Sequence, residues 1–271
     1  MALVPFPGKQ SPAYQLPPED PDDLGGKMSF LEHLDELRKR IIHSCYALVA
    51  GVAGAFWFHG QIYNFIFAPT LATLPEGARL VYNEPSEAFT IHVTVAVIAG
   101  LVVAAPYIMY QVWLFIAPGL YTNEKRLAIP FVVMSTAGFL GGAAFNHYVA
   151  FPYMMQFFGS FSGDDLLFLP RVEPVFSMYV KFLLGMGLVF QMPTVVYFLA
   201  KMKVVTAWFL ARHIKYAILI IFIVAAVVTP SGDPWTQTVF AAPMIALYAV
   251  SIVIAWVVGP KRMRGAPDDT A

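Results

Sequence analysis

Long apolar runs, each bounded by charged or proline-rich loops, constrain this chain more than any other feature of its sequence. A helix needs about 20 mostly apolar residues to cross a hydrocarbon core of about 30 Å. Such runs recur along a chain of 271 residues, of which 58% are hydrophobic and 13% are charged. The mean hydropathy of +0.65 lies well outside the soluble globular class. The sequence therefore predicts an all-α, polytopic integral membrane protein.

Helix start and stop signals divide the chain into six predicted transmembrane helices. Pro106 and Pro193 are expected to kink the second and fourth of them. Thr206 and Asp233 are expected to cap the last two, both of which we expect to be short spans. The predicted spans are 41–58, 86–115, 123–150, 174–200, 206–228 and 234–258, with a short amphipathic piece at 61–69 and an outer loop at 151–171.

The positions of the basic residues predict the orientation. With a cytoplasmic N-terminus, most of the 17 lysines and arginines lie inside, leaving only Arg79 and Arg171 outside and Lys181 within a span. This asymmetry predicts six spans with both termini in the cytoplasm. The expected division is a disordered, proline-rich, acidic tail at 1–27, a six-helix domain at 28–260 and a short tail at 261–271.

A charged amphipathic segment, Ser29 to Ile42, leads directly into the first span. Ser29 and Glu32 have the spacing of a capping box, which predicts a helix start here. On that helix Asp35 and Lys39, and likewise Glu36 and Arg40, stand four residues apart, and each pair is expected to form an ion pair. The simplest interpretation is an interfacial anchor. The only cysteine, Cys45, is expected to pack as a small hydrophobe.

Several classes of function lack the residues they need. All 17 acidic residues fall in the tails, the loops or the ends of the predicted helices, which disfavours a proton-relay transporter. The histidines are scattered and no nucleophile, metal-ligand or cofactor motif is evident, so we expect no catalysis, metal or cofactor. No basic patch with interleaved aromatics suggests nucleic-acid binding. The scattered histidines are His43, His59, His92 and His147.

Lys181 and Gln191 are the polar side chains that stand out within the predicted spans. Lys181 can extend toward the outer surface or pair with an outer-loop carboxylate. Gln191 can hydrogen-bond a neighbouring span or line a cavity. The sequence alone leaves these alternatives open.

Separated motifs along the chain resemble the TatC family, the multi-spanning subunit of the twin-arginine translocase. The first is Phe-Leu-Glu-His-Leu-Asp-Glu-Leu-Arg-Lys-Arg at 30–40. The resemblance extends from about residue 28 to 264. The other motifs are Tyr-Gln-Val-Trp at 110–113, Phe-Ile-Ala-Pro-Gly-Leu-Tyr at 115–121, Glu-Lys-Arg at 124–126, Phe-Gln-Met-Pro at 190–193 and the segment 229–237.

The resemblance implies a receptor in a bacterial cytoplasmic (inner) membrane that recognises the paired arginines of signal peptides on folded precursor proteins. It would nucleate a Sec-independent translocation complex driven by the proton-motive force. Glu36 and Glu124 match the family's recognition carboxylates, with Arg38, Phe115 and Pro118 in the motifs around them. A carboxylate suits the planar guanidinium fork. Glu124 also suits simple capping of the third span.

Further partners are implied by the resemblance. Thr229 and Gln237 match the place where the family docks the single-span TatA and TatB type subunits, and a homo-oligomer within the receptor complex is expected. Gln191 departs from the glutamate that many members carry, so a role that needs ionisation there is in doubt. A secondary transporter for a small solute and a scaffold without recognition function are the alternatives.

Overall fold

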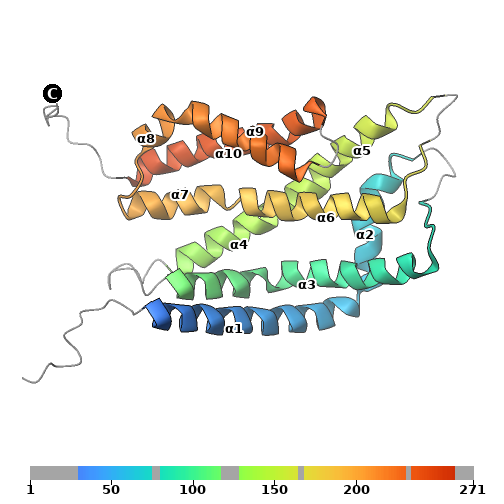
Figure 1. Cartoon of the computed structure of the whole chain (residues 1–271), viewed down its shortest axis with the longest axis horizontal. Coiled ribbons are helices and arrows are strands. Elements are labelled where there is room, and N and C mark those ends of the chain that lie inside the picture. The colour runs from blue at the N-terminus through green and yellow to red at the C-terminus, as the bar shows by residue number, and fades with distance from the viewer. Residues whose placement is uncertain (1–29, 75–79, 117–127, 164–167, 230–232, 260–271) are drawn as a thin grey trace, which may run out of the picture.

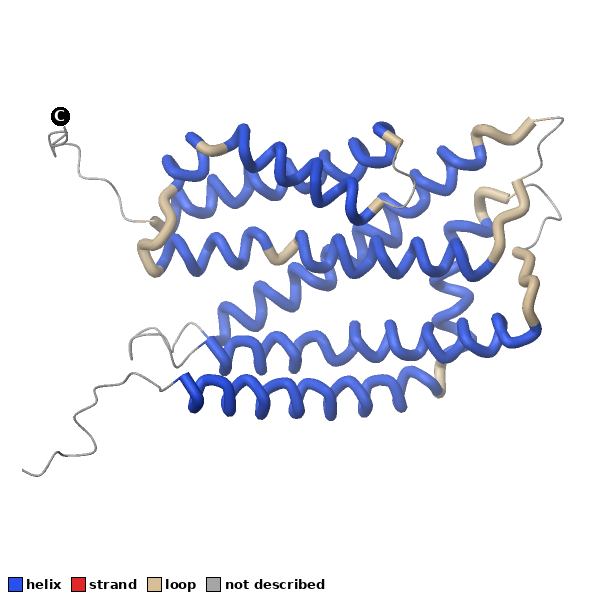
Figure 2. The backbone as a smooth tube through the Cα atoms, in the orientation of Figure 1, coloured by secondary structure: helices blue, strands red, loops and turns tan. Residues whose placement is uncertain are grey.

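The computed structural model describes residues 30–74, 80–116, 128–163, 168–229 and 233–259 (Figure 1). Every regular element in these ranges is a helix (Figure 2), which confirms the predicted all-α class. The tails at 1–27 and 261–271 lie outside the described residues, so the division into tails and domain stays a prediction.

Helices α1 (Phe30–Phe56) and α3 (Pro85–Ile116) run side by side (Figure 1). Their backbones touch where two glycines face each other. A Cβ atom on Gly51 would lie 2.6 Å from the carbonyl oxygen of Gly100, and one on Gly100 would lie 2.5 Å from the α1 backbone. Small residues allow this close packing between membrane helices. Helix α3 passes Pro106 without interruption, and the kink predicted there stays a prediction.

Helix α2 (His59–Leu71) follows α1 after a bend of 86°. The short helical piece predicted at 61–69 is therefore present. Ile66 and Phe67, 4% and 1% exposed, belong to the main core. The bend thus turns the chain inward at one end of the α1–α3 pair (Figure 1).

Helix α4 (Ala128–Phe145) continues through the π-helical turn η3 (Asn146–Ala150) into α5 (Phe151–Gly159). The outer loop predicted from residue 151 is wrong for this part of the chain. A proline in the first turn of α5 is tolerated in a helix. Phe151 and Met155, each almost fully buried, give this turn an inner face, so packing extends the helix.

The fourth predicted span is two helices, α6 (Val172–Val189) and α7 (Met192–Lys201). They are separated at Phe190 and Gln191, directly before Pro193. A proline cannot donate an interior helical hydrogen bond, and its ring clashes with the preceding turn. The predicted distortion at Pro193 is confirmed.

The last three helices are α8 (Ala207–Arg212), α9 (Ile214–Val228) and α10 (Pro234–Val258). Both predicted caps are confirmed: Thr206 Oγ1 accepts a backbone N–H three residues ahead at 3.2 Å, and Asp233 Oδ2 accepts one at 2.6 Å. With 25 residues, about 37 Å, α10 is long enough to cross a bilayer. The prediction that this last span is short is therefore wrong.

The main core is centred on α6, α10 and the start of α5, with further residues from α2, α3 and α9. Phe182 and Phe240 meet with their ring centroids 4.1 Å apart and are 0% and 2% exposed. Tyr179 and Phe151 pack edge to face at 5.0 Å in the same cluster. This cluster holds α6 in place against α10 and α5. Helix α7 follows α6 directly after the break at Phe190 and Gln191.

By length and composition, four helical rods within the described residues are apolar enough to cross a membrane, or five if the bent α1–α2 pair counts as one span. Helix α9, with 15 residues, or about 22 Å, is shorter than a bilayer core, as expected for the fifth span. The count of six spans therefore stays a prediction.

Most of the described basic residues gather at one end of the bundle; Arg171 and Lys181 are the exceptions. The start of α1, the end of α7 and the starts of α8 and α9 lie there, whereas α2, the start of α3 and the end of α5 lie at the other end (Figure 1). We call these the basic end and the opposite end. The basic end carries Arg38, Lys39, Arg40, Lys201, Lys203, Arg212 and Lys215.

Backbone contacts tie the opposite end together. Val81 and Arg171 form an isolated bridge, in which the backbone of Val81 bonds to both flanking residues of Arg171. The carboxylate of Glu87, 8% exposed, accepts the backbone N–H groups of Asn83 at 3.0 Å and Glu173 at 2.9 Å. Glu87 thereby joins the start of α3 to the start of α6.

Candidate functional site

Glu36 and Arg40 meet on the first turns of α1, at the basic end. Their spacing of four residues places both side chains on one helix face. Arg40 Nε donates to Glu36 Oε1 at 2.7 Å, and Nη2 bonds to the same oxygen. The Glu36 side chain is 16% exposed and that of Arg40 is 27% exposed. The predicted Glu36–Arg40 ion pair is confirmed, and it leaves Glu36 Oε2 without a hydrogen bond among the described residues. The ion pair predicted between Asp35 and Lys39 is wrong, because these two described side chains form no salt bridge.

Gln111 joins this pair from α3. Its Oε1 accepts a hydrogen bond from Arg40 Nη1 at 3.3 Å, and the residue is 3% exposed. Arg40 therefore connects the carboxylate on α1 to a buried amide on α3. Sequence reasoning gave neither Arg40 nor Gln111 a role in recognition. The available signal was a polar residue inside the apolar run of α3, in the motif Tyr-Gln-Val-Trp.

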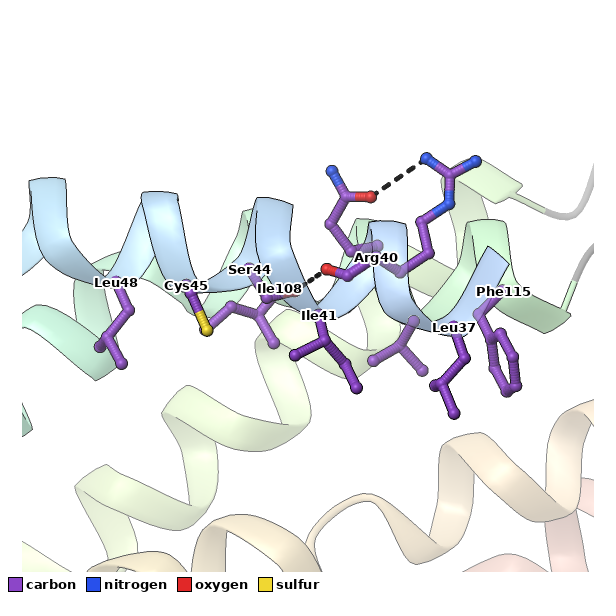
Figure 3. A pocket seen from close by; sticks show the side chains of 10 residues that line it. Leu37, Arg40, Ile41, Ser44, Cys45, Leu48, Ile108 and Phe115 are labelled. Carbon is purple, nitrogen blue, oxygen red and sulfur yellow. Dashed lines mark hydrogen bonds between the residues drawn. The ribbon is translucent and has the colours of Figure 1, made fainter. Parts of the chain in front are cut away.

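An apolar groove of about 230 Å³ lies along the α1–α3 seam beside this network. Figure 3 shows the side chains of Leu37, Ile41, Leu48 and Phe115 pointing to one side of the two helices, while the Arg40 guanidinium points to the other. Cys45 also lines the groove and is exposed. The prediction that Cys45 packs as a small hydrophobe is wrong, because its side chain is exposed in this groove.

The predicted recognition residues divide between described and undescribed parts of the chain. Phe115 lies near the end of α3, where its ring stacks on His33 of α1 at 4.5 Å and 21°. Arg38 is exposed on α1. Pro118 and Glu124 lie outside the described residues, in the connection from α3 to α4. That connection begins and ends at the basic end (Figure 1).

The polar residues predicted within the spans have separate environments. Gln191 stands at the α6–α7 break, where its Nε2 donates to the carbonyl oxygen of Ser135 on α4 at 3.0 Å and to that of Gly187 at 3.4 Å. The alternative that Gln191 bonds a neighbouring span is therefore the one observed. Lys181 is exposed on α6 and forms no ion pair with any described residue.

The two residues predicted to dock a partner helix have internal hydrogen bonds. Thr229 Oγ1 donates to the Ala225 carbonyl at 2.8 Å and is buried. Gln237 Nε2, on α10, donates to the Phe222 carbonyl of α9 at 2.7 Å. Their donors are thus satisfied within the chain and do not require a partner.

The structure brings together two histidines that the sequence reading treated as scattered. Nδ1 of His59 and Nδ1 of His92 lie 3.2 Å apart at the opposite end of the bundle. Within the described ranges, no three histidine, cysteine, aspartate or glutamate side chains gather as metal ligands would. The Glu36 network at the basic end is therefore best suited to binding a cationic group, with an apolar groove beside it.

Comparisons with known proteins agree on one family. The model of the Sec-independent protein translocase protein (TatC) family matches residues 32–243. A protein of that description from Koribacter versatilis is 43% identical over 242 residues, covering 88% of each chain. One from Desulforapulum autotrophicum is 38% identical and covers 87% of each.

Two solved structures have the same fold. Both are crystal structures of the twin arginine translocase receptor TatC, one of them in the detergent DDM, and each is 35% identical to this chain. Their TM-scores are 0.72 and 0.74, and the match covers 82% of this chain and 97% and 99% of the solved chains.

Proposed function

The chain belongs to the TatC family of Sec-independent protein translocase proteins, and from that premise we propose that its basic end binds the paired arginines of twin-arginine signal peptides. The bound precursors are folded proteins, and binding nucleates a translocation complex driven by the proton-motive force. The family is one of protein transport, and the apolar helices fit a multi-pass protein of the cytoplasmic (inner) membrane. The role of receptor and the residues below are our proposal.

The observation that carries the proposal is that only one of the two carboxylate oxygens of Glu36 accepts hydrogen bonds from described residues. Arg40 occupies Oε1, whereas Oε2 accepts no hydrogen bond from any described residue. A guanidinium group is planar and donates in parallel to carboxylate oxygens. One arginine of the signal peptide can therefore bind Oε2 directly, or replace Arg40 and take both oxygens.

The second arginine of the signal is assigned to Glu124. Helix α3 ends at Ile116 and α4 begins at Ala128, both at the basic end (Figure 1). The connection that carries Glu124 and Pro118 is therefore tethered on both sides near Glu36. Arg38, exposed on α1, and Phe115, stacked on His33, complete the proposed recognition residues.

The free energy of peptide binding must come from both ion pairs and the burial of apolar side chains. Exposed ion pairs contribute about 0.2 to 1 kcal/mol each, whereas micromolar binding requires about 8 kcal/mol. The apolar segment that follows the arginines must supply most of the remainder. The groove of Leu37, Ile41, Leu48 and Phe115 beside Arg40 is suited to that segment. The carboxylates then set specificity and register more than affinity.

Orientation and partners complete the proposal. Both termini lie in the cytoplasm, so that the basic end faces the compartment that contains folded precursors, as the distribution of basic residues favours. TatA and TatB type subunits bind near Thr229 and Gln237, where the short helix α9 leaves a hydrophobic mismatch that a partner span can relieve. Several copies of the chain assemble in the receptor complex.

The test compares two peptides on the purified chain. One carries paired arginines, and the other carries paired lysines before the same apolar segment. Glu36→Ala and Glu124→Ala should each weaken the arginine peptide far more than the lysine peptide, because lysine cannot reproduce the bidentate geometry. Equal losses for both peptides would refute the assignment of the two carboxylates.

A further inference from the structure

His59 and His92 form a pair of imidazoles at the opposite end of the bundle from the Glu36 network. His59 is the first residue of α2, directly after the bend, and His92 lies on α3. Their Nδ1 atoms are 3.2 Å apart, and the rings are inclined at 74° with centroids 4.8 Å apart. Two imidazole nitrogens from separate helices therefore lie close together.

The Nδ1–Nδ1 distance matches the separation expected for two histidine nitrogens bound to one metal ion. Zn²⁺ binds histidine nitrogen at about 2.0 to 2.1 Å in tetrahedral geometry, which places two such nitrogens about 3.3 Å apart. Imidazole also suits Cu²⁺ and Ni²⁺, with Cu²⁺ bound most tightly of the series. We propose that His59 and His92 form a two-imidazole binding site for a divalent transition-metal ion.

The surroundings hold the rings and leave the remaining coordination positions open. The ring of Phe56 lies 5.3 Å from that of His59, and the ring of Tyr63 lies 4.9 Å from that of His92. The pair opens into a depression that is also lined by the amide side chains of Gln61 and Asn64. Described residues supply no third histidine, cysteine or carboxylate, so water or an amide oxygen completes the shell.

Proton bookkeeping is simple for two neutral imidazoles. Each neutral ring carries one N–H, and without a metal one Nδ1–H can donate to the other Nδ1. When the metal binds both Nδ1 atoms, that ring moves its proton to Nε2, so no net proton is released. The same distance thus serves a hydrogen-bonded pair without metal and a chelate with it.

Metal binding at this position would fasten the α1–α2 bend to α3. His59 stands where the chain turns by 86°, and His92 belongs to the helix against which α1 packs. A ligand that binds only the folded arrangement stabilises it by an amount that grows with the ratio of free ligand to its dissociation constant. The metal is therefore expected to raise the thermal midpoint of the chain as well as to bind.

The experiment uses the full chain in nanodiscs, purified with a tag free of histidine. Zn²⁺ is titrated in competition with a chromophoric chelator, and Cu²⁺ is followed by electron paramagnetic resonance. We expect one saturable ion per chain and a spectrum of two nitrogen ligands. His59→Ala and His92→Ala should each weaken binding by about tenfold or more, because one of only two protein ligands is lost.

Two other histidines provide matched controls. His43 and His213 each bond through Nδ1 to a backbone carbonyl four residues earlier, at 2.7 and 2.8 Å. His43→Ala and His213→Ala should leave both titrations unchanged. His59→Cys should retain Zn²⁺, since a thiolate is also a zinc ligand, which separates a lost ligand from lost folding. Absence of saturable binding, or equal binding by both site variants and the parent chain, would mean a hydrogen-bonded pair only and overturn the proposal.

Discussion

Arg40 Nε lies 2.7 Å from Glu36 Oε1, so the carboxylate assigned to an incoming arginine already holds one from its own helix. Arg40 also donates to Gln111 of α3 at 3.3 Å. The site thus already contains a guanidinium–carboxylate contact of the kind that it is proposed to make with a signal peptide. Competition between the internal and the incoming guanidinium follows directly from this arrangement.

Arg40→Ala is expected to strengthen binding of a twin-arginine peptide. The change removes the competitor for Glu36 and one positive charge beside the site. Exposed pairs of this spacing contribute about 0.3 to 1 kcal/mol, so the dissociation constant should fall by about two- to fivefold. Peptide titration of the purified chain measures this.

The same substitution in a Glu36→Ala background provides the control. There the gain should vanish, because the carboxylate that Arg40 occupied is absent, and a double-mutant cycle isolates the coupling. Weaker binding by Arg40→Ala alone would instead mean that Arg40 holds Glu36 in its binding position.

Gly100→Ala should push α1 and α3 apart at the point where their backbones touch. A Cβ atom there would meet the α1 backbone at 2.5 Å, and backbone cannot swing aside as a flexible side chain can. Overpacking of this kind costs about 1 to 3 kcal/mol. We expect a lower midpoint of unfolding in detergent and weaker peptide binding, because Arg40 and Gln111 bridge the same seam.

Gly54→Ala, on the same helix as Gly51, is the matched control for that change. A Cβ atom on Gly54 has nothing within 4 Å. Alanine in place of an unconstrained helical glycine stabilises a helix by about 0.5 to 1 kcal/mol. The two substitutions should therefore shift the unfolding midpoint in opposite directions, and equal shifts would contradict the close packing at Gly100.

Glu87→Ala should loosen the opposite end of the bundle. The variant leaves the N–H groups of Asn83 and Glu173 without their acceptor, at a cost of about 1 to 3 kcal/mol if water does not replace it. Amide hydrogen exchange should increase at the starts of α3 and α6. Glu84→Ala, at an exposed position three residues earlier, should leave exchange unchanged. Similar exchange in both variants would argue against this link.

Gln191→Leu tests whether the polar residue at the α6–α7 break packs helices or takes part in recognition. The change removes the hydrogen bonds to the carbonyls of Ser135 and Gly187. Stability should fall by about 1 kcal/mol, the net contribution of a typical hydrogen bond. Twin-arginine peptide affinity should stay within about twofold, since Gln191 is not among the residues that line the groove. A large loss of affinity in a stable variant would assign Gln191 to recognition.

Local signals predicted much of the fold. Ser or Thr and Asp before an apolar run located the caps at Thr206 and Asp233, and Pro193 located the α6–α7 break. The extension of α5 beyond residue 151 was missed, because burial of Phe151 and Met155 depends on partners elsewhere in the chain. The 86° bend before α2 likewise left no proline or glycine pair as a signal in the sequence.

The contacts of the candidate site also divide into those that the sequence predicts and those that it does not. The Glu36–Arg40 pair follows from a spacing of four residues, so the sequence alone predicted it. The bond from Arg40 to Gln111 crosses from α1 to α3, and the His59–His92 pair crosses from α2 to α3. Such pairs depend on helix packing at Gly51 and Gly100, which no local pattern encodes.

Photocrosslinking can locate the arginines of a bound signal peptide on this chain. A twin-arginine peptide with a photoreactive residue beside the arginines is bound to the full chain, and the capture site is mapped by mass spectrometry. We expect capture at the start of α1 around Glu36 and in the α3–α4 connection that holds Glu124, with loss of capture when lysines replace the arginines. Capture at α2 or the end of α5, or equal capture of the lysine peptide, would contradict it.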